Sequence, residues 1–380
     1  MNIRIIASKK NWIEGRAVDQ LQKSFELAGM KAAVGMPDLH PGKGAPIGAV
    51  FASERFIYPH LVGSDIGCGM GLWQTGLRKD RLKLDKWVSR LEGLDLPWDG
   101  DSDQLLAEEG MKVSQFDNTL GTIGGGNHFA ELQVLHRIFD EELYAKMQLD
   151  RQALFLLVHS GSRGLGDSIL RWHAARFGSR GLYEGSSDAD DYIWAHDHAV
   201  NWARLNRRVI AERFANRIGT VGTPVLDICH NHVERETVEG NSCWLHRKGA
   251  ANSNKGTIVI PGSRGSFSYL VQPTEDQSKN LFTVAHGAGR KWNRSDCRAR
   301  LHRRYSESSL RRNKYGGRII CADKDLLYEE APQAYKDIDI VVSDLIDAGL
   351  IRPIAALSPV LTYKTGLVSQ FRKDQKPLYS

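Results

Sequence analysis

The sequence lacks the features that would place it in a membrane, in a secretion pathway or in a disulfide-bonded scaffold. No apolar run is long enough to cross a bilayer, and the opening residues MNIRII lack the apolar core of a secretion signal. The five cysteines are odd in number, widely spread and without a C-x-x-C pair, which argues against a disulfide framework or a zinc ribbon. We therefore expect a cytoplasmic protein.

Other absences concern nucleotide binding and domain organisation. There is no Walker A motif, so a bound nucleotide would have to be held by other loops. There is also no internal repeat, no linker and no low-complexity stretch, and 41% of the 380 residues are hydrophobic, which is ample for a core. Because polar glycine loops are scattered along the whole chain, we expect one intertwined α+β domain over residues 1–380, with mixed β-sheets and surrounding helices.

Positive charge is concentrated in one segment. The formal net charge is +6, yet residues 290–318 hold eleven Lys and Arg against Asp296 and Glu307, a local net of +9. The rest of the chain therefore sums to −3. A solvated charged face is the ordinary explanation of such a run, but a cluster this uneven favours contact with a polyanion such as nucleic acid.

Hydrophobic periodicity predicts both helices and strands. In the helix that we expect over 191–219, the buried face would hold Trp194, Ala203, Ile210, Phe214 and Ile218, and most Arg and His would be solvated. Proline and glycine indicate shaped loops at 36–50 and 119–129. The other predicted helices are 17–28, 82–91, 132–147 and 338–346, and the predicted strands are 3–8, 154–158, 224–229, 257–260, 268–272, 282–285 and 353–366.

The segment GSDIGCG at 63–69 combines an acid, a thiol and three glycines. Asp65 and Cys68 stand three residues apart, so one turn of backbone could aim an oxygen and a sulfur at the same metal ion or at an adjacent pair. A glycine-rich turn beside a buried structural cysteine is the plainer interpretation. Both interpretations stay open on this segment alone.

Four further loops place a histidine beside glycine, asparagine or serine, mostly where an apolar strand ends. They contain His128, His159, His230 and His286. Each histidine taken singly is better explained by a structural role, but four such loops are harder to dismiss. One Asp, one Cys and up to four His are enough ligands for two divalent metals with a bridging thiolate, an arrangement that suits phosphoryl or nucleotidyl transfer. Ligand softness alone would indicate zinc.

Glycine turns at 36–48 and 261–266 are candidate anion-binding loops, although ordinary tight turns would have the same composition. Lys364, in an apolar C-terminal strand, could contact a phosphate or a base, or could be an exposed edge-strand lysine.

Together these motifs closely resemble the RtcB-type RNA ligases. The resemblance runs from about Met36 to Lys364, and each motif is weak alone but the ordered set is highly specific. The motifs are MPDLHPGKGAPIG, GSDIGCG, GTIGGGNHFAE, VHSGSRGLG, HNHVERE, HRKGA, IPGSRGSFSY, HGAGR and AYKDID.

The resemblance implies two Mn(II) ions, in place of zinc, and GTP as the energy source. It implies that His286 is the nucleophile that becomes guanylylated and that Cys68 bridges the two ions. RNA ends bearing a 3′-phosphate or a 2′,3′-cyclic phosphate would be joined to a 5′-hydroxyl end. The implied metal ligands are Asp65, Cys68, His128, His159 and His230. The implied guanylate contacts are Asn127, Phe129, Glu131, Ser263, Ser268, Tyr335 and Lys364, with Asp38 near the site.

Within this resemblance Glu131 would select guanine, and Arg290 with the basic segment behind it would bind RNA phosphates. Three departures bear on substrate fit: Gly67 stands where the family usually has Asn, Arg264 follows the PGS serine where Met is usual, and only 251–259 remain of a longer segment. They indicate a compact paralogue, of a type found with a peptide-release-factor-like partner and suited to damaged ribosomal or transfer RNA.

Two other functions stay open from the sequence. One is a metal-dependent phosphoesterase or nuclease acting on RNA, because His230-Asn231-His232 superficially resembles an HNH element. The other is a catalytically idle RNA-binding paralogue that keeps the fold and the basic segment.

Overall fold

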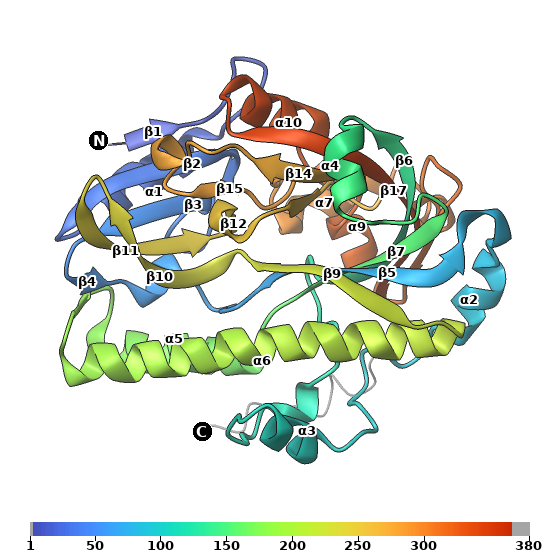
Figure 1. Cartoon of the computed structure of the whole chain (residues 1–380), viewed down its shortest axis with the longest axis horizontal. Helices are drawn as coiled ribbons and strands as arrows, with labels where there is room; N and C mark the ends of the chain where they lie inside the picture. Colours follow the sequence, from blue (N-terminus) through green and yellow to red (C-terminus); the bar gives the residue numbers. More distant parts are fainter. Residues whose placement is uncertain (1–2, 367–380) are drawn as a thin grey trace.

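Helices and strands alternate along the chain around two main β-sheets (Figure 1), which confirms the α+β class. The computed structural model describes residues 3–366. Within this range no helix combines the length and the apolar character needed to cross a bilayer.

The smaller main sheet has five strands and carries Asp38. The predicted loop over 36–50 is wrong in part, because β2 continues to His40 and β3 begins at Ile47. The pairing register shifts between Gly35 and His40, and Pro37, which has no amide hydrogen to donate, lies in this bulge. In sheet order the strands are β1 (Ile3–Ile5), β2 (Met30–His40), β3 (Ile47–Ser53), β11 (Asn241–Lys248) and β10 (Asn231–Val238).

The larger sheet is the floor of the candidate site. The helix predicted over 132–147 is wrong: residues 129–138 form β6, and only Glu141–Lys146 (α4) are helical. Both faces of β6 are covered, Leu132 by one core cluster and Leu135 by another, so the strand shows no clean alternation. The sheet order is β13 (Ile258–Pro261), β14 (Ser268–Pro273), β17 (Ile351–Thr365), β6 (Phe129–Ile138), β7 (Ala153–Ser160), β5 (Gly69–Arg78) and β9 (Gly222–Cys229), with β16 (Arg318–Cys321) also paired to β17.

The 32-residue helix α6 (Ser187–Ile218) packs along β5, β7 and β9 (Figure 1). Ser186 caps its first turn and Gly219 ends it in the left-handed conformation. The predicted buried face is confirmed except for Trp194, which is 56% exposed, and Arg207 is fully buried although solvation was expected. The remaining helices are α1 (Gly15–Phe25), α2 (Leu84–Arg90), α3 (Ser102–Glu108), α5 (Gly164–Phe177), α7 (Arg294–Leu301), α8 (Glu307–Leu310), α9 (Lys324–Glu329) and α10 (Ile338–Asp347).

Strand pairing brings four distant segments to one edge of the larger sheet. Gly69, at the start of β5, pairs with Ser160 at the end of β7 and with Cys229 at the end of β9. Phe129, at the start of β6, pairs with His159. The residues immediately outside these strand ends therefore meet in space, and they include Cys68, His128 and His230.

Two short ribbons complete the strand pairing. One pairs β12 (Ala250–Asn252) with β15 (Thr283–Ala285), and β15 ends directly before His286. The other pairs β4 (Phe56–Ile57) with β8 (Leu182–Tyr183). The hairpin of β10 and β11 was not predicted from the sequence.

Candidate active site

A cluster centred on a thiol lies at the edge where β5, β6, β7 and β9 meet. Sγ of Cys68 lies 3.4 Å from Nε2 of His128 and 3.2 Å from Nε2 of His159. Nε2 of His159 is 3.3 Å from Nε2 of His230, and Nε2 of His128 is 2.8 Å from Oδ2 of Asp65. Cys68 belongs to two groups of possible metal ligands, one with His159 and His230 and one with Asp65 and His128. A single thiolate placed in this way can bridge two cations.

Backbone carbonyls orient two of these imidazole rings. Nδ1 of His128 lies 3.2 Å from the carbonyl oxygen of Ile123, and Nδ1 of His159 lies 3.2 Å from that of Asn127. A carbonyl oxygen only accepts, so Nδ1 donates and the lone pair of Nε2 is left for a metal. The two rings therefore present their free nitrogens toward Cys68.

Burial controls the protonation of the cluster. It lowers the pKa of His159 and of His230 well below the usual value, with neighbouring histidines as further causes, so both rings are neutral at pH 7. Burial and the carboxylate of Asp65 raise the pKa of the Cys68 thiol. Burial would also raise the pKa of Asp65, but His128 holds it below its usual value. Neutral imidazoles, a carboxylate and a buried thiol fit a divalent cation, whose charge would favour the thiolate.

Arg207 fixes the loop that carries Asp65 and Cys68. Its Nη1 donates to the carbonyl oxygens of Gly67 and Ser160, at 2.8 Å each. Its Nε and Nη2 donate to the two carboxylate oxygens of Asp227, at 2.7 and 2.5 Å. One buried guanidinium thus ties the metal-binding loop to the ends of β7 and β9.

Glycine is required at position 67 by backbone angle and by space. Gly67 has φ +75°, and a Cβ there would lie 2.8 Å from Cβ of Ala203 and 2.8 Å from Cα of Val200, both in α6. The missing side chain therefore allows α6 to pack directly on the loop.

His286 lies beside the cluster, directly after β15. Its ring centroid is 4.7 Å from that of His230, and its Nδ1 is 2.6 Å from Oδ2 of Asp38. Asp38 is fully buried in the bulged end of β2. Its carboxylate accepts from Nδ1 of His286, which leaves Nε2 as the ring nitrogen available to a substrate.

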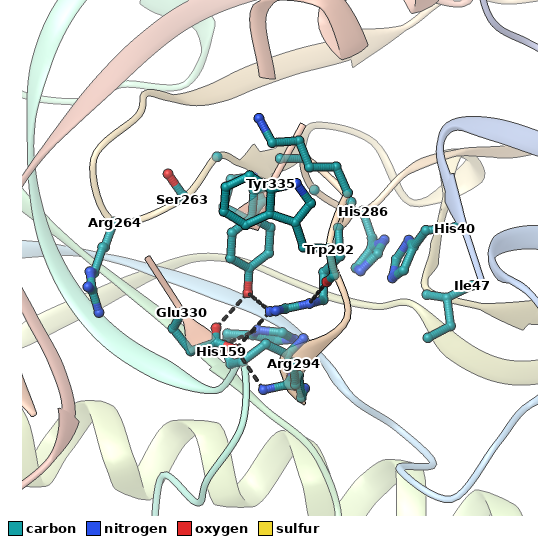
Figure 2. A pocket seen from close by; sticks show the side chains of 18 of the residues that line it. His40, Ile47, His159, Ser263, Arg264, His286, Trp292, Arg294, Glu330 and Tyr335 are labelled. Atoms are coloured by element: carbon teal, nitrogen blue, oxygen red, sulfur yellow. Dashed lines mark hydrogen bonds and ion pairs between the residues drawn. The ribbon is translucent and has the colours of Figure 1, made fainter. Parts of the chain in front are cut away.

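A cavity of about 440 Å³ opens beside His286. Figure 2 shows His286 and His40 at one side of it, Ser263 and Arg264 at the other, and Tyr335 between them. The predicted site residues that line the cavity are Asn127, Phe129, Glu131, His159, Ser263, His286, Tyr335 and Lys364.

Glu131 lies at the floor of this cavity. Its Oε1 accepts from Nε2 of Gln133 at 2.7 Å, and its Oε2 accepts from Oγ1 of Thr362. Gln133 also donates to Oγ of Ser268 at 2.7 Å, so the predicted residue Ser268 supports Glu131 from beneath. Burial raises the pKa of Glu131 to about 7 despite these hydrogen bonds.

Glu330 is a buried acid of the cavity that sequence reasoning missed. It pairs with Nη1 of Arg290 at 3.1 Å, with Nη1 of Arg294 at 2.7 Å and with Nζ of Lys364 at 3.3 Å. It also accepts from the hydroxyl of Tyr335 at 2.5 Å (Figure 2). Burial would raise the pKa of Glu330, but the three cations hold it at about 2. The only signal in the sequence was its place four residues before AYKDID.

The basic segment 290–318 divides into inward and outward groups. Arg290 and Arg294 point into the cavity toward Glu330, as Figure 2 shows for Arg294. The cations whose side chains are exposed include Arg303, Arg304, Arg312 and Lys314.

The comparison with known proteins identifies a family over nearly the whole chain. Residues 20–104 and 100–365 match the family described as tRNA-splicing ligase RtcB. The RNA-splicing ligase RtcB2 of Escherichia coli strain ATCC 25922 is 50% identical over 363 residues, which cover 94% of each chain. The tRNA-splicing ligase RtcB of Nanoarchaeum equitans is 29% identical over 460 residues and 95% of each chain.

A third relative, the RNA-splicing ligase RtcB of Escherichia coli K12, is 28% identical over 417 residues, covering 91% of this chain and 97% of the relative. The alignments with this protein and with the Nanoarchaeum ligase are longer than the 380-residue chain, so both alignments contain gaps in this chain. The alignment with RtcB2 is shorter than the chain. The chain belongs to the RtcB family of tRNA-splicing ligases.

Proposed function

We propose that this protein is a GTP- and Mn(II)-dependent RNA ligase that joins a 3′-phosphate or 2′,3′-cyclic phosphate end to a 5′-hydroxyl end. One observation carries the proposal: His286, oriented by Asp38, stands between the cluster centred on Cys68 and the cavity that contains Glu131. A nucleophile in that position can reach a nucleotide phosphate on one side while metal ligands lie on the other.

Two Mn(II) ions would be held by Asp65, Cys68, His128, His159 and His230, with Cys68 shared. When bound, they would neutralise charge on the phosphate groups that react. The softness of thiolate and imidazole favours zinc, whereas the family resemblance favours manganese, so the choice of metal is part of the test.

The guanylate would occupy the cavity with its α-phosphate at His286. Glu131 would accept from the N1 and N2 hydrogens of guanine, which adenine does not offer in the same way. Asn127, Phe129, Ser263, Ser268, Tyr335 and Lys364 would complete the guanylate site, and Asp38 would act through His286. The supporting geometry is that Glu131 and Lys364 share a cavity with His286 and that Nζ of Lys364 lies over the ring of Phe129 at 5.8 Å.

The reaction would proceed in three transfers. Nε2 of His286 attacks the α-phosphate of GTP, forming a P–N bond and releasing pyrophosphate. An oxygen of the RNA 3′-phosphate then takes the GMP, breaking the P–N bond and forming an RNA-ppG end. The 5′-hydroxyl attacks the 3′-phosphate of that end, forming the phosphodiester and releasing GMP. A 2′,3′-cyclic phosphate must first be opened by hydrolysis to the 3′-phosphate.

RNA phosphates would contact the exposed cations of segment 290–318, and the substrate would be damaged transfer or ribosomal RNA. A functional link to a release-factor-like protein and a single ligase domain over residues 1–380 belong to the same proposal.

A ligation assay with defined ends tests the function. Two RNA strands, one ending in a 3′-phosphate and one beginning with a 5′-hydroxyl, should be joined only with GTP and Mn(II), and a 3′-hydroxyl with a 5′-phosphate should stay unjoined. The His286→Ala variant should join neither pair. No product with any divalent metal, together with RNA binding unchanged in Cys68→Ala, would instead support an idle RNA-binding paralogue.

The nuclease alternative requires His230 and His232 to act together. His232 is directed away from the cluster, with its Nε2 3.2 Å from Nη1 of Arg247 and 3.6 Å from Oε1 of Glu234. A nuclease function would also leave His286, Glu131 and Lys364 without a role. Cleavage of intact RNA in the absence of GTP is the result that would favour hydrolysis over ligation.

A further inference from the structure

Arg264 has one guanidinium nitrogen that is hydrogen-bonded and one that has no partner among the described residues. It follows Ser263 in the turn between β13 and β14, and it is 6% exposed. Its Nη2 donates to the carbonyl oxygen of Leu327 at 2.8 Å. Its Nη1 is buried and has no hydrogen-bond partner within residues 3–366. Burying a guanidinium N–H group without an acceptor costs free energy, so a bound ligand that accepts from Nη1 would be stabilised.

Two of the acids that line the cavity, Glu131 and Glu330, are already engaged by other donors. Glu131 accepts from Gln133 and Thr362, and Glu330 accepts from Tyr335 and is paired with cations that do not include Arg264. Neither carboxylate accepts a hydrogen bond from Nη1 of Arg264, which has no partner within the described residues.

Arg264 lies where the base of a nucleotide would be placed. It lines the same cavity as Glu131, Lys364 and His286, and Figure 2 shows it across the cavity from His286. A nucleotide whose α-phosphate is at His286 extends its base toward this far side. Guanine carries hydrogen-bond donors at N1 and N2 and acceptors at O6 and N7, and arginine is the usual partner of those acceptors.

We propose that Nη1 of Arg264 donates to the acceptor edge of guanine, O6 and N7, and so acts with Glu131 as a second determinant of base specificity. The inference rests on the proposed function, which places guanylate in this cavity. Glu131 would take the donor groups and Arg264 the acceptor groups of the same base. Adenine has an amino group in place of O6, so it would direct hydrogens at the guanidinium.

The test is direct nucleotide binding in the His286→Ala background, where no covalent step occurs. The dissociation constants of GTP, 7-deaza-GTP, which lacks N7, and 6-thio-GTP, in which sulfur replaces O6, are measured with Arg264 present and with Arg264→Met. With arginine, at least one analogue should bind about tenfold or more weakly than GTP. With methionine, the ratio of the dissociation constant of the analogue to that of GTP should be within about threefold of one, because a thioether donates no hydrogen bond.

Two further variants keep the test sharp if Arg264→Met is less stable. Arg264→Lys retains the charge but cannot hold the Leu327 carbonyl and the base at once, so it should also lose the analogue ratio. Glu131→Gln should retain that ratio and instead reduce the preference for guanosine over inosine triphosphate, which lacks the N2 amino group. Melting temperatures of all variants identify any that are unfolded.

The outcomes separate this inference from the proposed function. If GTP still binds and the ratios of analogue to GTP dissociation constants are the same with Arg264 and with Arg264→Met, the role of Arg264 is overturned and the proposed function is not. Failure of the Arg264 protein to bind GTP overturns the proposed function and this inference with it.

Discussion

Asp38 and His286, 248 positions apart in the chain, are joined by a 2.6 Å contact between Oδ2 and Nδ1. The same carboxylate oxygen lies 3.3 Å from the backbone nitrogen of His286, so both the ring and the backbone of that residue are held. Gly289 allows this approach, because a Cβ there would lie 2.3 Å from the carbonyl oxygen of Asp38. The pair sets which ring nitrogen of His286 faces the cavity.

Substitution of Asp38 should slow guanylylation without weakening metal binding. Asp38→Ala removes the acceptor that orients the ring, and we expect a loss of roughly 10- to 100-fold in the rate of GMP transfer to the protein. Asp38→Asn keeps an acceptor oxygen but loses the charge, so its loss should be smaller. The measurement is the single-turnover rate at saturating GTP, with Mn(II) affinity measured in parallel. An unchanged rate in both variants would exclude the orienting role.

Arg207 should support both stability and metal affinity. Arg207→Met removes a fully buried guanidinium, so the carbonyl oxygens of Gly67 and Ser160 lose a donor and the partly exposed carboxylate of Asp227 loses its partner. We expect unfolding to become easier by about 1–3 kcal/mol. Arg207→Lys cannot reach Gly67, Ser160 and Asp227 together, so Mn(II) affinity should fall roughly 10- to 100-fold. Calorimetric titration with Mn(II) and chemical denaturation measure the two effects.

The neighbouring Arg208 is the matched control for Arg207. It is partly exposed and paired with Glu109, so Arg208→Met should change stability by no more than about 1 kcal/mol and leave metal affinity unchanged. Equal effects of the two arginine substitutions would contradict a specific role for Arg207.

GTP affinity should depend on pH through Glu131. In the proposed guanylate site the ionised carboxylate would accept the N1 and N2 hydrogens of guanine, and burial raises the pKa of this carboxyl to about 7. Above this pH the group is already ionised and affinity should be level. Below it the group is protonated and binding must first release that proton, so affinity should fall as the pH drops. Binding is measured in His286→Ala, and Glu131→Gln should give a flatter profile.

The exposed cations of segment 290–318 should affect RNA and not GTP. Replacing Arg303 and Arg304 by Gln should reduce the slope of log affinity against log salt by about 0.7 for each phosphate of single-stranded RNA that the protein no longer neutralises. The control replaces Arg171 and Arg180, which are also exposed but lie in and after α5. An identical salt slope in both double variants would place RNA elsewhere.

The sequence predicted the residue types of the site better than their arrangement. Cys68, His128, His159 and His230 each stand at or next to a strand end. For His159 and His230 the sequence predicted that strand, over 154–158 and 224–229. Their convergence depends on which strands pair, such as Gly69 with both Ser160 and Cys229. Pairing between distant segments leaves no trace in local periodicity.

The errors have related physical causes. Strand β6 was predicted as a helix because its two buried faces hide the alternation that identifies a strand. Arg207, Glu330 and Arg264 were expected at the surface or left unassigned. The sequence around a charged residue does not show which distant residues will contact it in the fold. All three acquire partners from segments at least 20 positions away: Asp227 for Arg207, Lys364 for Glu330 and the carbonyl of Leu327 for Arg264.

The most direct test of the account is to locate GMP on the protein. After incubation with GTP and Mn(II), the protein is digested without acid, and the peptides are sequenced by mass spectrometry. We predict one GMP added to the peptide that contains His286, at the imidazole, and none in His286→Ala or in protein stripped of metal. GMP on another residue, or no adduct in wild-type protein with any divalent metal, would contradict the assignment of His286 as the nucleophile.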